Sequence, residues 1–244
     1  MKSICVIPAR YSSTRLPGKP LADICGKPMI CRVWERASLA RSVAEVIVAT
    51  DDERILRAVE DNHGRAMMTR ADHKTGTDRL AEVAEKFPDV EIVVNVQGDE
   101  PLIEPSLIDE LVAAFAEDKD LQMATVATEL ADAAEMNNPN NVKVVLGKNN
   151  DALYFSRSLI PYPRNAGKSP VFKHIGIYAY RRQFLIDYAK MPPTPLEQAE
   201  SLEQLRALEN GFRIRVIKSS CQFIGVDTEE DLQLVNEIYR EETS

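Results

Sequence analysis

Long hydrophobic runs are missing from this sequence. No apolar stretch approaches the roughly 18 residues that a membrane-spanning helix requires. The apolar run near the N-terminus covers only residues 4–7 before Pro8 interrupts it, which is too short for the core of a signal peptide. We therefore expect a protein with no membrane-embedded part that stays in the cytoplasm.

Cysteine and histidine are also scarce. The chain has four cysteines without a C-x-x-C pair and three histidines without metal-ligand spacing. The motifs G-x-S-x-G, H-E-x-x-H and G-x-G-x-x-G do not occur, so serine hydrolases, zinc proteases and dinucleotide-dependent enzymes are disfavoured. We expect the cysteines to be reduced and structural, with Cys5 acting as a small hydrophobic residue.

Positive charge is in deficit, because the formal net charge is -8. Such a balance argues against a surface that coats nucleic acid. Residues 7–21 nevertheless hold three cations, Arg10, Arg15 and Lys19, and no anion. Multiple charged donors on a proline-restrained loop suit a triphosphate. The alternative is a solvated basic loop with a few surface ion pairs.

The order of hydrophobic segments predicts an α/β fold. Strand-like runs without polar alternation are interleaved with amphipathic helices, which indicates a mostly parallel sheet covered on both faces. We expect the first strand to end at Pro8, which cannot donate to a sheet ladder, and Pro28 to be a first helical position. The predicted strands cover residues 3–7, 46–49, 65–68 and 91–97, and the helices lie at 28–40, from 50, from 77 and around 107–115.

The pattern changes between residues 139 and 180. Strand-like residues 142–146 and 172–180 enclose a loop at 161–169 that is rich in Pro, Asn, Gly and Ser. We expect one domain over residues 1–244 with an inserted β-rich subdomain at about 139–180. After it we expect helices at 181–190 and 196–209, a strand at 213–217 and a final helix from residue 228.

Acidic residues follow the strongest strand. Gly98 and Asp99 come directly after residues 91–97, and ligands of open α/β sheets bind beyond the carboxyl ends of strands. Gly98 would allow close backbone approach, and Asp99 would be a hard oxygen ligand for Mg²⁺. The alternative is that Asp99 or Glu100 only ends the strand.

Two further segments have two interpretations each. Asp227 and Thr228 precede a predicted helix, so Asp227 is either a second metal ligand or an ordinary N-cap, like the similar residues 50–53. Residues 75–79 either start a helix or form a polar loop that lines a cleft, with Arg79 as a partner for a carboxylate. The spacing leaves both questions open.

Seven segments carry a further pattern, and they are residues 7–21, 49–53, 75–79, 95–101, 174–178, 200–206 and 225–228. In this order they resemble the 3-deoxy-manno-octulosonate cytidylyltransferases, also called CMP-Kdo synthetases. The resemblance implies a Rossmann-like nucleotidyltransferase fold and a homodimer built largely through the inserted subdomain. It also implies Mg²⁺-dependent transfer of CMP from CTP to the anomeric hydroxyl of Kdo, releasing pyrophosphate, for lipopolysaccharide biosynthesis.

The same resemblance implies roles for individual residues. It makes Asp99 and Asp227 the metal-binding pair. It makes Arg15, Lys19, Asp99 and Asp227 catalytic. The residues implied to bind the nucleotide are Pro8, Ala9, Arg10, Arg15, Lys19 and Gln97. The residues implied to bind the sugar acid are Arg79, Gln97, Arg157, His174, Tyr178, Glu203 and Gln204.

Other readings of the motif set differ in specific features. Sialic-acid cytidylyltransferases share the Pro-Ala-Arg start but typically continue with Ser-Lys and Lys-Asn, where this chain has Thr14-Arg15 and Lys19-Pro20. Methylerythritol cytidylyltransferases usually carry a Gly-x-Gly-x-Arg loop, which is absent here. The same reaction on 8-amino-Kdo or another sugar acid stays an alternative. A non-catalytic module that binds a nucleotide is the alternative from another class.

Overall fold

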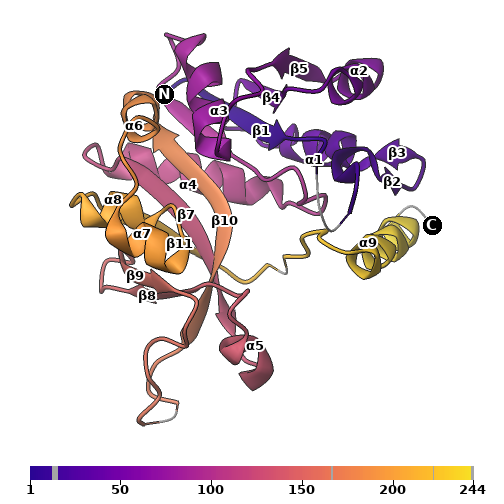
Figure 1. Ribbon diagram of the computed structural model, residues 1–244. Helices are drawn as coiled ribbons and strands as arrows, with labels where there is room; N and C mark the ends of the chain where they lie inside the picture. Colours follow the sequence, from indigo (N-terminus) through magenta and orange to yellow (C-terminus); the bar gives the residue numbers. More distant parts are fainter. Residues whose placement is uncertain (13–15, 166, 222, 243–244) are drawn as a thin grey trace.

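The central element of the computed structural model is a mixed β-sheet with the strand order β11-β7-β10-β6-β1-β4-β5. The structure describes residues 1–12, 16–165, 167–221 and 223–242. Six of these strands run in one direction, and β10 runs antiparallel to both β6 and β7, which confirms an α/β fold with a mostly parallel sheet (Figure 1). The strands are β1 Ser3–Ala9, β4 Glu45–Thr50, β5 Arg65–Met68, β6 Ile92–Asn95, β7 Met123–Leu130, β10 Val171–Arg181 and β11 Ile214–Ser219.

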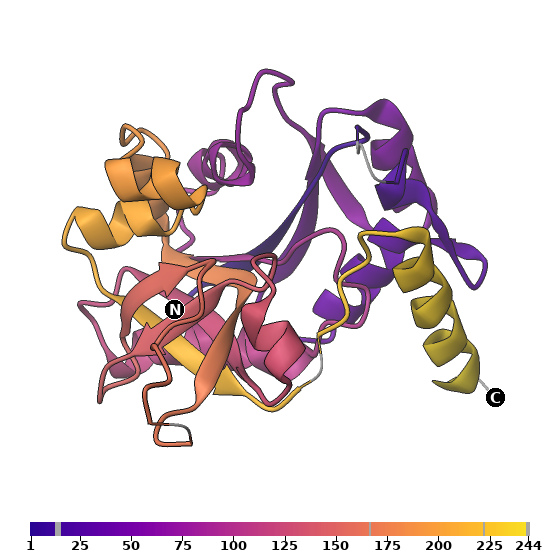
Figure 2. The same cartoon turned by 60° about the horizontal axis from the view of Figure 1, so that its bottom comes forward.

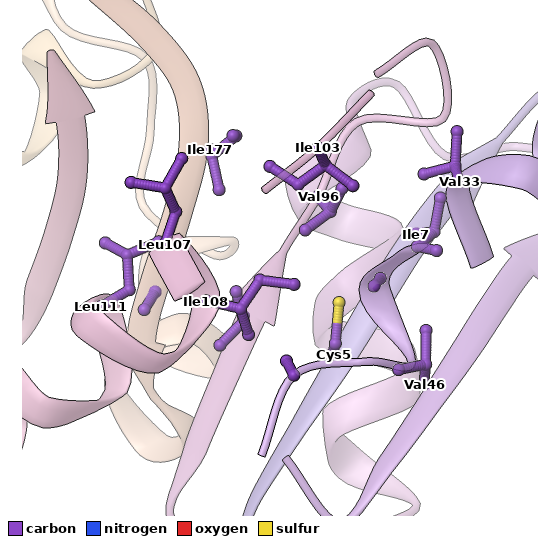
Figure 3. Close-up of a cluster of buried hydrophobic side chains, with 14 of the residues drawn as sticks. Cys5, Ile7, Val33, Val46, Val96, Ile103, Leu107, Ile108, Leu111 and Ile177 are labelled. Carbon is purple, nitrogen blue, oxygen red and sulfur yellow. The ribbon is translucent and has the colours of Figure 1, made fainter. Parts of the chain in front are cut away.

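Helices cover both faces of this sheet. Successive residues of a strand point to opposite faces, so Cys5 and Ile7 of β1 join the core under α1, α2 and α4, as Figure 3 shows for α1 and α4. Ile4 and Val6 join the core under α3, α6 and α8. The helices are α1 Met29–Ala37, α2 Glu53–Asp61, α3 Gly76–Glu85, α4 Pro105–Glu117, α6 Arg182–Tyr188 and α8 Leu205–Glu209.

The β-rich region extends the central sheet. Strand β8 (Lys143–Leu146) pairs with both β10 and β9 (Ala152–Ser156), so it is continuous with the main sheet through β10. Helix α7 (Pro195–Glu200) lies beside α8, and helix α5 (Ala133–Asn137) contacts β7 (Figure 1). The expectation of an inserted β-rich subdomain at about 139–180 stays a prediction.

The C-terminal helix α9 (Glu229–Glu242) lies at the other end, beside α1 and the short hairpin of β2 (Asp23–Ile24) and β3 (Lys27–Pro28) (Figures 1 and 2). A third cluster of buried side chains, which includes Ile24, Val226 and Val235, attaches it. This attachment brings the segment just before α9, which contains Asp227, back to the N-terminal loop.

The first strand is longer than predicted, because β1 continues through Pro8 to Ala9. In a strand, every second residue directs its backbone N–H and C=O groups to the same neighbouring strand. Val6 faces β6, where its carbonyl accepts from Val96 N at 3.2 Å, so Pro8 faces the same side. Strand β6 has already ended at Asn95, and the missing N–H of Pro8 therefore removes no ladder bond.

One other boundary and one whole strand differ from the sequence prediction. Pro28 is the N-cap residue of α1, not its first helical residue. The central strand β7 was not predicted at all. Its Ala- and Thr-rich residues Met123–Leu130 lack the run of Ile, Val and Leu that marks β1 and β6, and its neighbours β10 and β11 supply the burial instead.

All four cysteines are free thiols, as predicted, and Cys5 and Cys31 are buried. Burial raises the pKa of the Cys5 thiol to about 12, so this side chain is a packing residue. No helix within the described residues combines the length and the apolar character needed to cross a membrane.

Candidate active site

Lys19 lies at the centre of the candidate site. Gly18, with φ +69°, adopts a left-handed conformation that favours glycine, and the turn η1 (Lys19–Leu21) follows it. The Lys19 ammonium contacts Asp99 Oδ2 at 2.5 Å and Asp227 Oδ1 at 3.0 Å. Three segments that are far apart in the sequence thus meet at one charged group.

The carboxyl end of β6 positions Asp99. A Cβ atom at Gly98 would lie 3.1 Å from the carbonyl oxygen of Pro8, so glycine lets this turn pass close to the end of β1. Val226 N donates to the Asp99 carbonyl at 2.9 Å. This backbone bond holds the segment with Asp227 against the turn with Asp99.

The structure excludes one of the two interpretations of Asp227, the N-cap, and its role as a metal ligand stays a prediction. The residue that caps α9 is Thr228, whose Oγ1 accepts from Asp231 N at 3.2 Å. Asp231 Oδ2 in turn accepts from the backbone N–H groups of Asp227 and Thr228 at 3.0 and 2.8 Å. The Asp227 carboxylate is not the cap and points to Lys19 instead.

The carboxylates of this cluster raise the pKa values of the groups beside them. Burial lowers the pKa of Lys19, but contacts with Asp99 and Asp227 outweigh it, so the pKa is raised and the ammonium stays charged at neutral pH. The neighbouring Glu100, which the sequence analysis did not assign to the site, has a pKa raised to about 7 by burial and by Asp99. The described residues contain no group of three or more His, Cys, Asp or Glu arranged to hold a metal.

A cavity of about 360 Å³ opens beside Lys19 at the carboxyl ends of β1 and β6. It brings together five of the six residues predicted to bind the nucleotide and both predicted metal ligands. Arg15 lies outside the described residues. The cavity is lined by Pro8, Ala9, Arg10, Ser12, Lys19, Pro20, Gln97, Gly98, Asp99 and Asp227.

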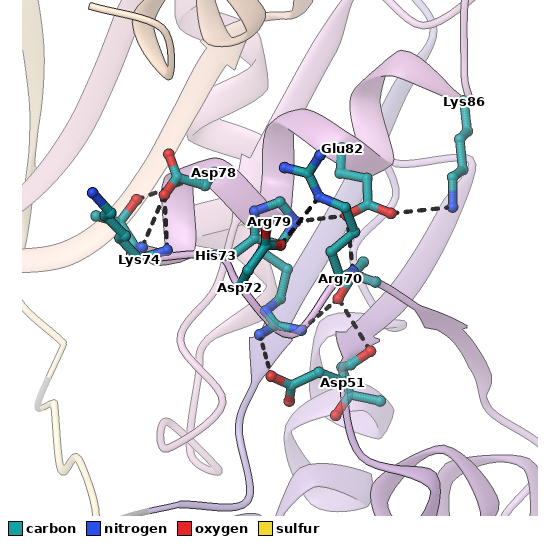
Figure 4. Close-up of polar contacts among 12 residues, drawn as sticks. Asp51, Arg70, Asp72, His73, Lys74, Asp78, Arg79, Glu82 and Lys86 are labelled. Carbon is teal, nitrogen blue, oxygen red and sulfur yellow. Dashed lines mark hydrogen bonds and ion pairs between the residues drawn. The ribbon is translucent and has the colours of Figure 1, made fainter. Parts of the chain in front are cut away.

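Arg10 is held by the loop that follows β5. Its Nη2 donates to the carbonyl oxygens of His73 at 2.7 Å and Thr75 at 3.2 Å. The loop itself is held by Glu82, which contacts His73 Nε2 at 2.5 Å and accepts from Arg70 N at 3.0 Å (Figure 4). The guanidinium therefore keeps a defined position at the rim of the cavity.

A second cavity of about 140 Å³ lies on the other side of Gln97, which lines both cavities. Gln97 Nε2 donates to the Gly176 carbonyl at 3.0 Å, which fixes this side chain between them. Four residues predicted to bind the sugar acid, Gln97, Tyr178, Glu203 and Gln204, meet here. The full lining is Gly76, Thr77, Asn95, Gln97, Met123, Tyr178, Tyr180, Tyr188, Glu203 and Gln204.

Arg79 and Arg157 line neither cavity. The Arg79 side chain is completely buried, with its guanidinium 2.9 Å from Asp51 Oδ2 and hydrogen-bonded to Thr69 (Figure 4). Thr75 caps α3, so residues 75–79 start a helix, and Gly76 and Thr77 at this start also line the second cavity. Arg157 donates to the backbone carbonyls of Glu200 and Pro139 at 2.8 and 3.2 Å. In this structure both arginines hold the protein together, and direct contact with the sugar acid stays a prediction.

His174 also lies outside the lining of both cavities. Its Nε2 is 3.0 Å from Thr125 Oγ1, whose hydroxyl hydrogen points to backbone carbonyls, so His174 is the donor. The ring packs against Phe155 and Tyr178. Burial lowers the pKa of His174 to about 3, so the ring is neutral at pH 7 and offers no charge to an anionic substrate.

This burial predicts a pH dependence of stability. The folded pKa of about 3 lies below the ordinary value of 6.5, so on acidification the unfolded state takes up a proton before the folded state does, and stability falls as pH drops below 6.5. We expect His174→Gln to remove this contribution. Between pH 7 and 5 the wild type should lose about 2 kcal/mol more than the variant. Urea unfolding at both pH values measures it, and equal losses would contradict the assignment.

Several residues of the second cavity, among them Thr77, Asn95 and Tyr180, are not among the site residues predicted from the sequence. Asn95 carried a detectable signal, because it is the polar residue that ends the apolar strand Ile92–Asn95. Tyr180 and Tyr188 carried none, since aromatic residues in a strand and a helix are ordinary core residues. Only the packing of α6 on β10 brings these two to the cavity.

Comparisons with known proteins agree with this geometry. A family model described as cytidylyltransferase matches residues 4–217. Proteins named 3-deoxy-manno-octulosonate cytidylyltransferase are 54% identical, from Fusobacterium nucleatum over 96% of both chains and from Geobacter metallireducens over 97% of both. A solved structure of CMP:2-keto-3-deoxy-manno-octonic acid synthetase complexed with CTP is 51% identical, with a TM-score of 0.95 over 99% of this chain and 100% of that one.

A more distant structure shares the fold alone. It is 4-diphosphocytidyl-2C-methyl-D-erythritol synthase from Anaerococcus prevotii, 15% identical with a TM-score of 0.65 over 98% of this chain and 96% of that one. At this low identity the likeness shows a common architecture, and a common architecture does not by itself imply common chemistry.

Proposed function

We propose that Lys19, Asp99 and Asp227 carry the chemistry of this chain, which belongs to the 3-deoxy-manno-octulosonate cytidylyltransferase family. The chain is an enzyme that transfers CMP from CTP to 3-deoxy-D-manno-octulosonate (Kdo), giving CMP-Kdo and pyrophosphate. In the reaction the anomeric oxygen of Kdo bonds to the α-phosphorus, the bond from this phosphorus to the β-phosphate oxygen breaks, and the anomeric hydroxyl loses its proton.

The observation that carries this assignment of residues is the position of Gln97 between two unlike cavities. The larger one contains Arg10, Lys19 and the two aspartates and suits a triphosphate. The smaller one is walled by hydroxyl, amide and carboxyl groups and suits a polyhydroxylated acid. An acceptor in one cavity and a nucleotide in the other would meet beside Gln97, which is the arrangement that a transfer between them requires.

The protein must bring an anionic acceptor to an anionic triphosphate. Arg10 and Lys19 supply fixed positive charge on the nucleotide side, which lowers the repulsion and stabilises negative charge that develops on pyrophosphate as it leaves. Arg15 has the same predicted role. Because Arg10 is held by two backbone carbonyls, its charge needs little reorganisation during the reaction.

Asp99 and Asp227 fit a Mg²⁺ site, because two carboxylates already converge on one cation, the Lys19 ammonium. Magnesium is commonly held by one or two carboxylates together with substrate phosphates, so a pair is a sufficient protein contribution. When bound, Mg²⁺ would neutralise phosphate charge and favour ionisation of the acceptor hydroxyl. Lys19 would then bind the phosphates in place of the carboxylates.

We extend the proposal to assembly and location. A homodimer is supported by the side chains of Leu153 on β9 and Tyr162, which are 63% and 84% exposed and belong to the β-rich region. A cytoplasmic enzyme of lipopolysaccharide biosynthesis is supported by its nucleotide substrate and by four free thiols, which fit a reducing compartment.

The experiment that tests the function is pyrophosphate release by the purified protein with CTP and Mg²⁺. Kdo, 8-amino-Kdo and N-acetylneuraminate are offered in parallel, with ATP, GTP and UTP as nucleotide controls. We expect release only with CTP and Kdo. Preference for 8-amino-Kdo would show that the amino sugar, and not Kdo, is the acceptor. No release with any acceptor would contradict the function. The sedimentation mass of the same sample, about twice 27.3 kDa for a dimer, tests the assembly.

A further inference from the structure

The second cavity contains polar atoms without partners. Within the described residues, Asn95 Oδ1, Glu203 Oε1 and Gln204 Nε2 are buried and make no hydrogen bond, and all three residues line the cavity of about 140 Å³. A buried polar atom without a partner costs about 1–3 kcal/mol. Three of them around one cavity indicate that a ligand supplies the missing bonds.

Asn95 is the most enclosed acceptor of the three. Its residue is 4% exposed, and it ends β6 between two neighbours of the same sheet, paired with Val6 of β1 and Tyr178 of β10. Glu203, by contrast, follows α7 in a connecting segment, and its carboxyl is 3.8 Å from Arg206. Asn95 thus projects from the rigid centre of the fold, where its position is set most accurately.

The part of the substrate that reaches Asn95 follows from the relation between the cavities. The anomeric oxygen of Kdo must lie near Lys19 and Asp99, on the nucleotide side of Gln97. The carbons remote from the anomeric centre then extend past Gln97. Since a water molecule has a share of about 30 Å³ in the liquid, a cavity of about 140 Å³ has room for the end of the sugar.

We propose that Asn95 is a specificity-determining residue whose Oδ1 accepts a hydrogen bond from a hydroxyl group at C7 or C8 of the sugar acid. The inference rests on the proposed function, because it assumes Kdo as the acceptor. A buried acceptor discriminates strongly against an analogue that lacks the donor hydroxyl, since the analogue leaves the acceptor unpaired. Asn95 therefore selects acceptors by the hydroxylation of their far end.

The test compares Kdo with its 7-deoxy and 8-deoxy analogues in wild type, Asn95→Ala and Asn95→Leu. The leucine fills the volume of the amide, so it separates the lost hydrogen bond from an empty space. We expect kcat/KM for Kdo to fall roughly 10- to 100-fold in both variants, mainly through KM for Kdo, with KM for CTP changed less than about twofold. One of the two analogues lacks the hydroxyl that Asn95 binds. For this analogue, wild type and variants should have equal kcat/KM within about threefold.

Asn62→Ala is the matched control, because Asn62 also uses its side-chain amide, donating to Ala58 at the end of α2, away from both cavities. It should leave the discrimination between Kdo and the analogues unchanged. Equal losses for Kdo and for both analogues in the Asn95 variants, or no loss for Kdo, would overturn the role of Asn95. Absence of pyrophosphate release by the wild type would instead overturn the proposed function itself.

Discussion

Asp99→Asn should reduce kcat by roughly 100- to 1,000-fold, the range seen when one preorganised electrostatic group is removed from an active site. The substitution keeps the shape of the side chain and its place after β6 but removes the negative charge. Asp99 is one of the two carboxylates that converge on Lys19. Its loss removes half of the protein ligands proposed for Mg²⁺ and also frees Lys19 from its shorter contact.

Steady-state rates of pyrophosphate release over a Mg²⁺ titration measure this effect. We expect the variant to require more Mg²⁺ for half-maximal rate in addition to its lower kcat. Asp120→Asn is a suitable control, because this aspartate lies in the turn before β7, on a part of the chain that lines neither cavity. Turnover by Asp99→Asn within about threefold of the wild type would exclude the catalytic role.

Asp51→Ala should destabilise the protein by about 3–5 kcal/mol, the cost of removing one partner of a buried ion pair. The Arg79 side chain has no exposed surface, and its guanidinium contacts Asp51 at 2.9 Å. Arg79 Nε already lacks a partner among the described residues. Without Asp51 the protein would retain a buried positive charge that, in the part of the chain that the structure describes, only the hydroxyl of Thr69 contacts directly.

The neighbouring Asp52→Ala variant provides the matched comparison. Asp52 caps α2 and pairs with Arg54, whose side chain is 58% exposed, so its loss should cost only about 1 kcal/mol. Chemical unfolding of both variants gives the two values. A loss of less than 1 kcal/mol for Asp51→Ala would show that this ion pair does not hold Arg79. Arg79 would then again be a candidate for binding the substrate.

The sequence by itself determined the layered α/β architecture and the place of the chemistry. Apolar runs without polar alternation require burial on both faces, so strands β1, β4 and β6 were predictable from their residues alone. The carboxyl ends of parallel strands meet at one edge, and Lys19, Gln97 and Asp99 follow from that rule together with the family resemblance. Strand β7 was missed because its Ala and Thr residues become buried only through their neighbours.

The tertiary structure alone decided what individual polar residues do. Asp227 and Asp52 stand in similar local sequences, and only the attachment of α9 to the N-terminal region directs Asp227 to Lys19 while Thr228 takes the cap. Arg79 had the charge of a substrate ligand, but α3 turns it into the interior toward Asp51. Asn95 ends an ordinary buried strand, and its unpaired oxygen gains a function only because β10 and the segment of Glu203 and Gln204 enclose a cavity there. Local sequence carries burial and periodicity, whereas the partner of a charge or an amide is a long-range property of the fold.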